Sequence, residues 1–205
     1  MAPPKCSFTY FNGRGRGEQI RWLFVQAGAE WEDRRIEQDA WPELKPKAPT
    51  GALPFIEVAG KAIGQSGAVA MYVARENGLL GSSNLEAAQI HMLWECTQDA
   101  LNAMFKAMFC KDSDKQAAMF NDYYTQSLPK LIKLMAAHLK GGRDWLIGNK
   151  VSMADLVTVC LLENYTDGPG LAAIEAEPSV KALIERVKNL PNIKKWIATR
   201  PASQF

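Results

Sequence analysis

The residues LPFIEVAGKAIGQS, at positions 53–66, combine the signals of a strand, a tight turn and a helix start. Pro54 opens an apolar run with strand character, and proline, which has no N–H group, occurs at strand starts and sheet edges. A cis bond before Pro54 would expose the backbone of Leu53 to an extended guest chain. Gln65 and Ser66 stand at the start of a predicted helix, where N–H groups and the helix dipole favour a carboxylate. The stretch therefore predicts a docking edge for a small acidic peptide.

Each half of this stretch also has a purely structural interpretation, because Pro54 can simply start a core strand and Ser66 can simply cap a helix. Support for a ligand site comes from the first predicted strand, residues 5–11, which ends in Tyr10-Phe11. A loop rich in glycine and arginine follows at residues 12–18. Ligands gather at the carboxyl ends of strands in open α/β sheets, so both features point to the same edge.

The first 79 residues have the pattern of a βαβ unit followed by a hairpin and a helix. Apolar residues at helical spacing, closed by Gly28, predict a crossover helix between two parallel strands. The expected elements after the first strand are a helix over about 20–27, a strand at 31–36, a helical turn from 41, strands at 55–58 and 61–63 that turn at Ala59-Gly60, and a helix over 66–76.

Residues 80–205 change to a purely helical period. Apolar residues separated by threes and fours run from 90 to 108 and again from 117 to 139, which predicts two long antiparallel helices. Pro129 lies inside the second helix and is expected to bend it. Ser152 and Asp155 have the spacing of a capping box. The predicted fold class is α/β plus all-α, with domains at 1–79 and 80–205.

Composition narrows the functional classes. The 205 residues are 47% hydrophobic, and 24 basic and 22 acidic residues, free of long runs, give a net charge of +2. We therefore expect no nucleic-acid partner.

The N-terminus lacks the apolar core of a signal peptide and no segment approaches the roughly 18 apolar residues of a membrane span, so we expect a cytoplasmic protein without membrane contact. Cys6, Cys96, Cys110 and Cys160 lack zinc-site spacing, which predicts reduced and mostly buried thiols.

The tyrosine that ends the first strand, the Leu-Pro and Gln-Ser pairs and the capped Ser152-Asp155 helix together resemble the cytosolic glutathione transferases, from end to end. This resemblance implies a thioredoxin-like first domain and a helical second domain. The string YFNGRGRGE at 10–18, with DRRIEQ at 33–38 and Trp41-Pro42, is similar to the sigma class, which includes haematopoietic prostaglandin D synthase and the cephalopod S-crystallins.

The resemblance implies roles for individual residues. Tyr10 would hydrogen-bond the glutathione sulfur and Arg16 would assist it, so these are the candidate catalytic residues. The candidate glutathione-binding residues are Tyr10, Arg16, Trp41, Lys45, Leu53, Pro54, Gln65, Ser66 and Asp99. Trp41 and Lys45 would hold the glycyl carboxylate, Leu53 the cysteinyl backbone, and Gln65 and Ser66 the γ-glutamyl end. In the family the acid at the position of Asp99 comes from the neighbouring subunit, which implies a homodimer.

A hydrophobic electrophile would lie in a second-substrate pocket, for which the candidate residues are Gly13, Leu101, Phe105 and Val157. Three features depart from the prostaglandin synthase pattern. Ala52 replaces a longer polar side chain, Lys106 stands where that enzyme has a tryptophan wall, and Glu95, Gln98 and Asp99 replace its clustered acids. We therefore expect no metal and a more polar pocket.

The sequence thus predicts a glutathione S-transferase that conjugates glutathione to hydrophobic electrophiles. Two alternatives stay open: a crystallin-like structural protein of the same fold with little activity, and a glutathione-dependent isomerase of the prostaglandin D synthase type. Gly13, Gly15 and Gly17 also suggest a dinucleotide loop, but that motif needs a glycine where Glu18 stands. Arg14 and Arg16 lack the neighbouring aromatic residues of an RNA-binding patch.

Overall fold

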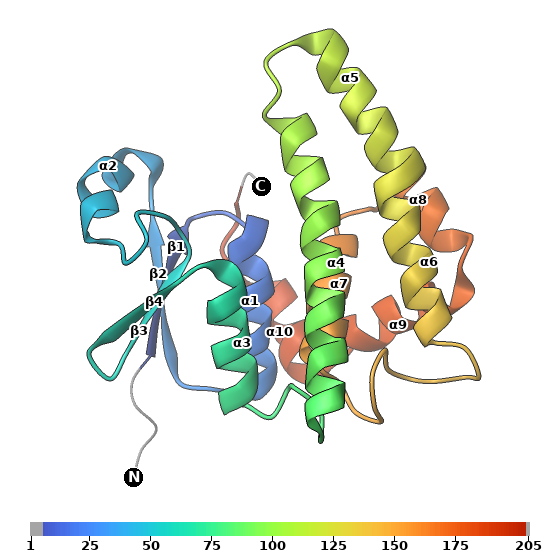
Figure 1. The fold of residues 1–205 in the computed structure, drawn as a ribbon, viewed down its shortest axis with the longest axis horizontal. Helices are drawn as coiled ribbons and strands as arrows, with labels where there is room; N and C mark the ends of the chain where they lie inside the picture. Colours follow the sequence, from blue (N-terminus) through green and yellow to red (C-terminus); the bar gives the residue numbers. More distant parts are fainter. Residues whose placement is uncertain (1–5, 204–205) are drawn as a thin grey trace. The chain divides into compact units, whose positions relative to one another are not determined.

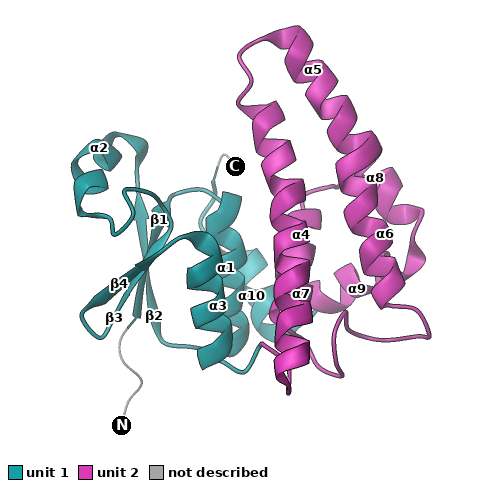
Figure 2. Cartoon of the chain, viewed as in Figure 1, with its two compact units in different colours: residues 1–79, 189–205 teal, residues 80–188 magenta. Residues whose placement is uncertain are grey.

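The computed structural model describes residues 6–203, so Lys5 of the predicted first strand lies outside the described residues. The chain forms two compact units, residues 1–79 together with 189–205, and residues 80–188 (Figure 2). Contacts thus group residues 189–205 with the first unit, whereas the sequence pattern predicted a helical domain over 80–205.

The first unit contains a four-stranded mixed sheet with the strand order β2-β1-β3-β4 (Figure 1). Strand β1 pairs in parallel with β2, while β3 is antiparallel to both β1 and β4. The strands are β1 (Cys6–Phe11), β2 (Trp31–Ile36), β3 (Phe55–Val58) and β4 (Lys61–Gly64). The predicted βαβ unit and hairpin are confirmed, and the hairpin turns at Ala59 and Gly60, both with positive φ.

Helices α1 (Gly15–Ala27) and α3 (Ser66–Glu76) contact each other and lie on the same side of the sheet in Figure 1. Phe8 and Ile56 are paired across β1 and β3, are both 0% exposed, and share the sheet face that meets Phe24 of α1. Burying each of these side chains contributes about 1.5–3 kcal/mol. Helix α1 ends as predicted at Gly28, whose φ of 62° suits glycine.

The helical turn expected from Trp41 is α2 (Trp41–Leu44), which lies between two short 3₁₀ segments, η1 (Gln38–Ala40) and η2 (Lys45–Lys47). The last helix of the unit is α10 (Pro191–Thr199), which packs on α1.

The second unit is helical. Its elements are α4 (Asn84–Met108), α5 (Ser113–Asp122), η3 (Tyr123–Ser127), α6 (Leu128–His138), α7 (Met153–Leu162), α8 (Gly168–Glu175) and α9 (Pro178–Lys188). The first predicted long helix is confirmed as α4. The second predicted long helix is also present, because α5, η3 and α6 follow one another without a break over 113–138, and η3 is a π-helical turn within this run. Pro129 cannot donate to the carbonyl of Thr125 four residues earlier, so regular α pairing stops here.

Helix α7 is buried along its whole length, and the predicted capping box at its start is confirmed. The carboxylate of Asp155 accepts hydrogen bonds from the backbone N–H of Ser152 and from its hydroxyl, each at 2.8 Å. The backbone N–H of Leu146 donates to the same carboxylate, also at 2.8 Å. Burial raises the pKa of Asp155 to about 6, and these three hydrogen bonds oppose the shift.

Replacing Asp155 by alanine should lower the free energy of unfolding at pH 7 by about 3 kcal/mol, because two buried N–H groups lose their acceptor. The folded-state pKa lies above the unfolded value, so this group stabilises the fold fully below pH 3.8 and loses that contribution as the pH rises to about 6. The free energy of unfolding, measured by urea denaturation between pH 3.8 and about 6, should depend less on pH in Asp155→Ala than in the unsubstituted protein. Asp122→Ala, at an exposed position, is the matched control, and equal losses in both variants would contradict the capping role.

Candidate functional site

Strands β1, β3 and β4 are paired along one row near the same end of the sheet. Thr9 pairs with Phe55, and Phe55 pairs with Gly64 across β3 and β4. Because neighbouring strands alternate in direction here, the next residues beyond this row are Tyr10, Pro54 and Gln65. Adjacent strands lie about 4.8 Å apart. The structure therefore brings the tyrosine, the Leu-Pro pair and the Gln-Ser pair to one edge.

The peptide bond between Leu53 and Pro54 is cis. Pro54 is buried and Leu53 is half-buried. The paired residues of β3 begin at Phe55, so the backbone of Leu53 lies outside the ladder of the sheet. The backbone of Leu53 is therefore placed to pair with an added extended chain.

Gln65 has an unusual backbone conformation, with φ 70° and ψ 121°. A residue other than glycine in such a region costs on the order of 1–3 kcal/mol, and such strain is concentrated at functional sites. The side chain of Gln65 is exposed, and Ser66 follows as the first residue of α3. The strained turn thus presents a polar side chain beside a helix N-terminus.

Tyr10 packs directly against the first turn of α1. A Cβ atom added to Gly17 would lie 2.2 Å from Cδ1 of the tyrosine ring, so only glycine fits there. The backbone N–H of Arg16 donates a hydrogen bond to the Tyr10 hydroxyl. Burial raises the pKa of Tyr10, while that hydrogen bond and the charges of Arg16 and Arg21 oppose the shift. The hydroxyl therefore stays protonated near neutral pH and can donate.

The loop between Tyr10 and Arg16 is braced by Arg21, whose side chain is fully buried. Its guanidinium donates to the carbonyl of Gly13 at 2.6 Å and to that of Phe11 at 3.1 Å. Asp33 of β2 balances the charge at 3.0 Å. Arg21 was not among the predicted site residues. Its place one turn after Gly17, among the apolar positions of a crossover helix, was the available signal.

Glu18 is a second buried charge, and the sequence predicted no role for it. Its carboxylate is 3% exposed and accepts hydrogen bonds at Oε1 from Trp196 at 2.8 Å and from Arg200 at 2.9 Å. The indole of Trp22 donates to the same oxygen at 3.2 Å. A buried carboxylate needs such donors to offset its desolvation. Glu18 therefore fixes the C-terminal segment against the start of α1.

Trp41 and Lys45 lie at α2 and just after it. The ring of Phe11 lies 6.0 Å from the ring of Trp41 and 5.8 Å from that of Tyr10, measured between centroids. Phe11 thus connects Trp41 to the edge that carries Tyr10. Lys45 is exposed, and its role stays a prediction.

The remaining candidate residues are Gly13, in the loop after β1, and four residues of the second unit. Gly13 is buried and its carbonyl accepts a hydrogen bond from Arg21, and Asp99 is exposed on α4. Leu101 and Val157 are 2% and 0% exposed, so both belong to the core that α4 and α7 share. The Phe105 ring lies 5.9 Å from that of Phe109. The roles of these residues in a second-substrate pocket or a shared site stay predictions.

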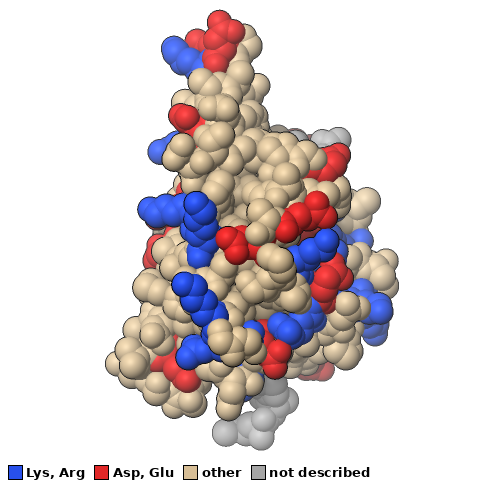
Figure 3. Space-filling model, turned by 90° about the vertical axis from the view of Figure 1, so that its right-hand side faces the viewer, with Lys and Arg blue, Asp and Glu red and all other residues tan. Residues whose placement is uncertain are grey.

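The described residues also give information on metal sites, membrane spans, cysteines and surface charge. Within residues 6–203 no group of three or more His, Cys, Asp or Glu side chains is arranged to hold a metal ion, and Glu95 instead pairs with His91 at 3.1 Å. No helix in that range is long and apolar enough to cross a bilayer. All four cysteines are free; two are buried and two half-buried. On the face in Figure 3, basic and acidic side chains are interspersed.

Comparison with known proteins matches both halves of the chain. Residues 6–75 match the family described as "Glutathione S-transferase, N-terminal domain", and residues 98–200 match "Glutathione S-transferase, C-terminal domain". Among curated proteins, Hematopoietic prostaglandin D synthase of Gallus gallus is 38% identical over 97% of this chain and 98% of its own. Glutathione S-transferase 1 of Ascaris suum is 34% identical over 98% of this chain and 100% of its own.

Solved structures agree with this result. The monomeric Na-GST-3, a glutathione S-transferase of the hookworm Necator americanus, superposes with a TM-score of 0.89 at 33% identity, covering 98% of this chain and 100% of its own. Prostaglandin synthase D of Nilaparvata lugens superposes with a TM-score of 0.87 at 32% identity and the same coverage.

Proposed function

Because this chain belongs to the glutathione S-transferase family, we propose that it conjugates reduced glutathione to hydrophobic electrophiles through a thiolate stabilised by Tyr10. The observation that carries the proposal is the row formed by Tyr10, Pro54 and Gln65 at one edge of the sheet. This row offers a hydroxyl donor, an unpaired strand position and a strained polar turn, side by side.

Glutathione would bind in extended form along this edge. The backbone of Leu53 would pair with the cysteinyl unit, as an added strand does. Gln65 and Ser66 would take the γ-glutamyl carboxylate at the start of α3, where the helix dipole favours a negative charge. Trp41 and Lys45 would hold the glycyl carboxylate through the indole N–H and the ammonium charge.

The chemistry follows from the hydroxyl of Tyr10. The hydroxyl already accepts a hydrogen bond from the Arg16 backbone, so its own proton is available to a thiolate placed beyond it. An ordinary thiol has a pKa of about 8.5, and only the thiolate attacks an electrophile. A donor and the nearby charge of Arg16 stabilise that anion, so the ionised fraction rises at neutral pH. The thiolate then displaces the leaving group of the electrophile.

Gln65→Gly should separate fold stability from ligand binding. Glycine adopts positive φ without strain, so we expect the free energy of unfolding to rise by about 1 kcal/mol. Removal of the amide should weaken retention on immobilised glutathione, because one polar contact to the γ-glutamyl end is lost. Thermal melting and affinity chromatography measure the two effects. Ala59→Gly, at the other non-glycine residue with positive φ among residues 6–203, should gain stability and bind normally.

The proposed function is tested by the rate of glutathione conjugation to a chloronitrobenzene acceptor, together with retention on immobilised glutathione. Retention with turnover supports a transferase. Retention without turnover favours the isomerase or the crystallin-like binder, and failure to bind would contradict the assignments of Leu53, Gln65 and Ser66.

A glutathione-dependent isomerase is the second candidate, and it is favoured by the similarity to the prostaglandin D synthase of Gallus gallus along almost the whole chain. It would use the same thiolate, so the difference lies in the second substrate. Lys106, exposed on α4, argues for a more polar pocket. An assay with a prostaglandin endoperoxide, run beside the conjugation assay, separates the two candidates.

We further propose a sigma-class protein of the cytoplasm that forms a homodimer in which Asp99 completes the partner's site. The similar Necator americanus protein is described as monomeric, so assembly needs a direct measurement. Sedimentation as a monomer with full activity would contradict the dimer.

A further inference from the structure

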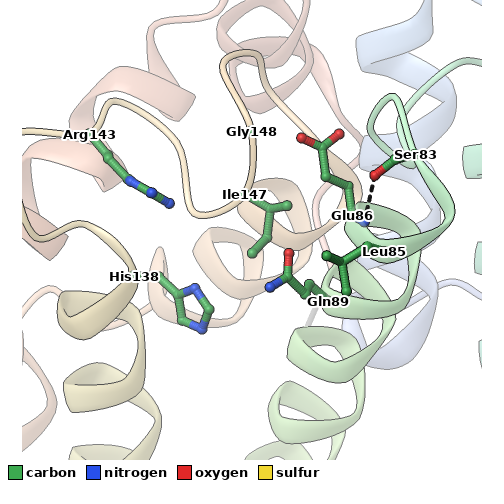
Figure 4. A pocket seen from close by; sticks show the side chains of 8 residues that line it. All are labelled: Ser83, Leu85, Glu86, Gln89, His138, Arg143, Ile147 and Gly148. Carbon is green, nitrogen blue, oxygen red and sulfur yellow. Dashed lines mark hydrogen bonds between the residues drawn. The ribbon is translucent and has the colours of Figure 1, made fainter.

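The second unit contains a pocket of about 500 Å³ that has no part in the proposed function. Its walls come from three segments of the chain: the start of α4, the end of α6, and the loop that precedes α7 (Figure 4). The lining residues are Ser83, Leu85, Glu86, Gln89, His138, Arg143, Ile147 and Gly148. A volume of this size is typical of sites for small molecules.

Three polar side chains from the three segments point into this pocket: Gln89, His138 and Arg143 (Figure 4). The structure records no hydrogen bond or ion pair of these side chains with the rest of residues 6–203. All three can donate, and the planar guanidinium of Arg143 matches the two oxygens of a carboxylate. The pocket therefore carries convergent donors suited to an anion.

The loop that carries Arg143 is fixed in place. Arg186 of α9 donates to the carbonyl of Asp144 at 2.8 Å and pairs with its carboxylate at 2.9 Å. Two residues later, the backbone N–H of Leu146 is held by Asp155. A ligand would therefore have to order the exposed side chain of Arg143 but not the backbone that carries it, which lowers the entropic cost of binding.

The pocket is polar at two sides and apolar between them. Figure 4 shows Glu86 on one side and Arg143 on the other, with the side chain of Ile147 between them. Glu86 accepts hydrogen bonds from the backbone N–H of Ser82 at 2.6 Å and from its hydroxyl at 2.8 Å, and these bonds lower its pKa. Glu86 therefore stays negatively charged and disfavours a second negative charge on the ligand.

We propose that this pocket binds a small organic monocarboxylate with an apolar body. The carboxylate accepts hydrogen bonds from Arg143, with His138 and Gln89 as further donors. The apolar body packs against Ile147, which is 5% exposed, and the more exposed Leu85. The inference rests on the second unit alone and does not depend on the glutathione site.

The test uses the full chain and 4-(trifluoromethyl)phenylacetate as the probe, followed by ¹⁹F NMR in excess glutathione. Arg143→Gln should weaken binding by at least about tenfold, because a charged bidentate contact is lost. Lys140→Gln removes the same charge from an exposed neighbouring position outside the pocket lining and should change binding by less than about twofold. The neutral amide of the probe should bind at least about tenfold more weakly than the carboxylate.

Equal losses in Arg143→Gln and Lys140→Gln would show non-specific charge attraction and overturn the proposal. Equal binding of the acid and the amide, or no binding of the acid at millimolar concentration, would overturn it as well. Gln89→Leu provides a second variant, with a smaller expected loss of about threefold to tenfold. Retention of Arg143→Gln on immobilised glutathione and an unchanged melting temperature would establish that the variant is folded.

Discussion

Tyr10→Phe should lower the rate of glutathione conjugation by about tenfold to a hundredfold, the range that one hydrogen bond to a charged group provides. The hydroxyl is oriented for this task, because its oxygen already accepts from the Arg16 backbone. The aromatic ring is unchanged, so the packing against Gly17 and the fold should persist. Retention on immobilised glutathione should be nearly normal, since the peptide contacts of Leu53, Gln65 and Ser66 remain.

The pH profile gives a second measure of the same effect. Loss of the Tyr10 donor removes stabilisation from the thiolate, so the pKa of bound glutathione should rise toward that of a free thiol. The conjugation rate of Tyr10→Phe should therefore recover in part as the pH increases. Tyr72→Phe, on α3 of the same unit, is the matched control. An unchanged rate in Tyr10→Phe would remove Tyr10 from the mechanism.

Local patterns were enough to predict most of the fold. The strand at 31–36 and the helix at 66–76 were predicted with the bounds that the structure has. In both segments the burial pattern and the boundary residues belong to the element itself, so the sequence of that element carries the information. The pairing of the Pro54 and Gln65 ends was also predictable, because the short turn at Ala59 and Gly60 fixes the register of β3 and β4. Tyr10 was expected at the same site because it ends the first strand, and ligands gather at the carboxyl ends of strands.

Contacts between distant segments were not predictable in this way. Glu18 accepts hydrogen bonds from Trp196 and Arg200, which follow it by 178 and 182 residues. Neither the periodicity of apolar residues nor the spacing of motifs predicts such a pair. The C-terminal segment was therefore assigned to the helical domain, although a buried carboxylate ties it to α1. The π-helical turn at Tyr123–Ser127 was missed for a related reason, since Pro129 predicts a disturbed helix but not the form it takes.

The glycines of the loop after β1 also have a different physical role from the one that their spacing first suggests. Gly15 has a φ of 39°, which lets the chain enter α1. Gly17 allows the Tyr10 ring to approach the helix backbone. Neither role involves a dinucleotide, and both concern the placement of one hydroxyl.

Gly17→Ala is the second change for which we expect a large effect. The new methyl group would lie 2.2 Å from the Tyr10 ring, so the ring must move. Overpacking of this kind costs about 1–3 kcal/mol of stability. A shift of about 1 Å at a reacting group can cost on the order of a hundredfold in rate. We therefore expect a large loss of conjugation activity with a modest fall in melting temperature.

A double-mutant cycle shows whether Gly17 acts through Tyr10, because neighbouring residues that share one effect are not additive. In the Tyr10→Phe background the hydroxyl is already absent, so Gly17→Ala should reduce conjugation by less than about twofold. In the Tyr10→Ala background the ring is gone, so the added methyl group should no longer lower the melting temperature. Full additivity of the rate losses would mean that Gly17 supports activity by another route, such as the position of Arg16. Recovery of stability only in Tyr10→Ala would identify the ring itself as the contact that requires glycine.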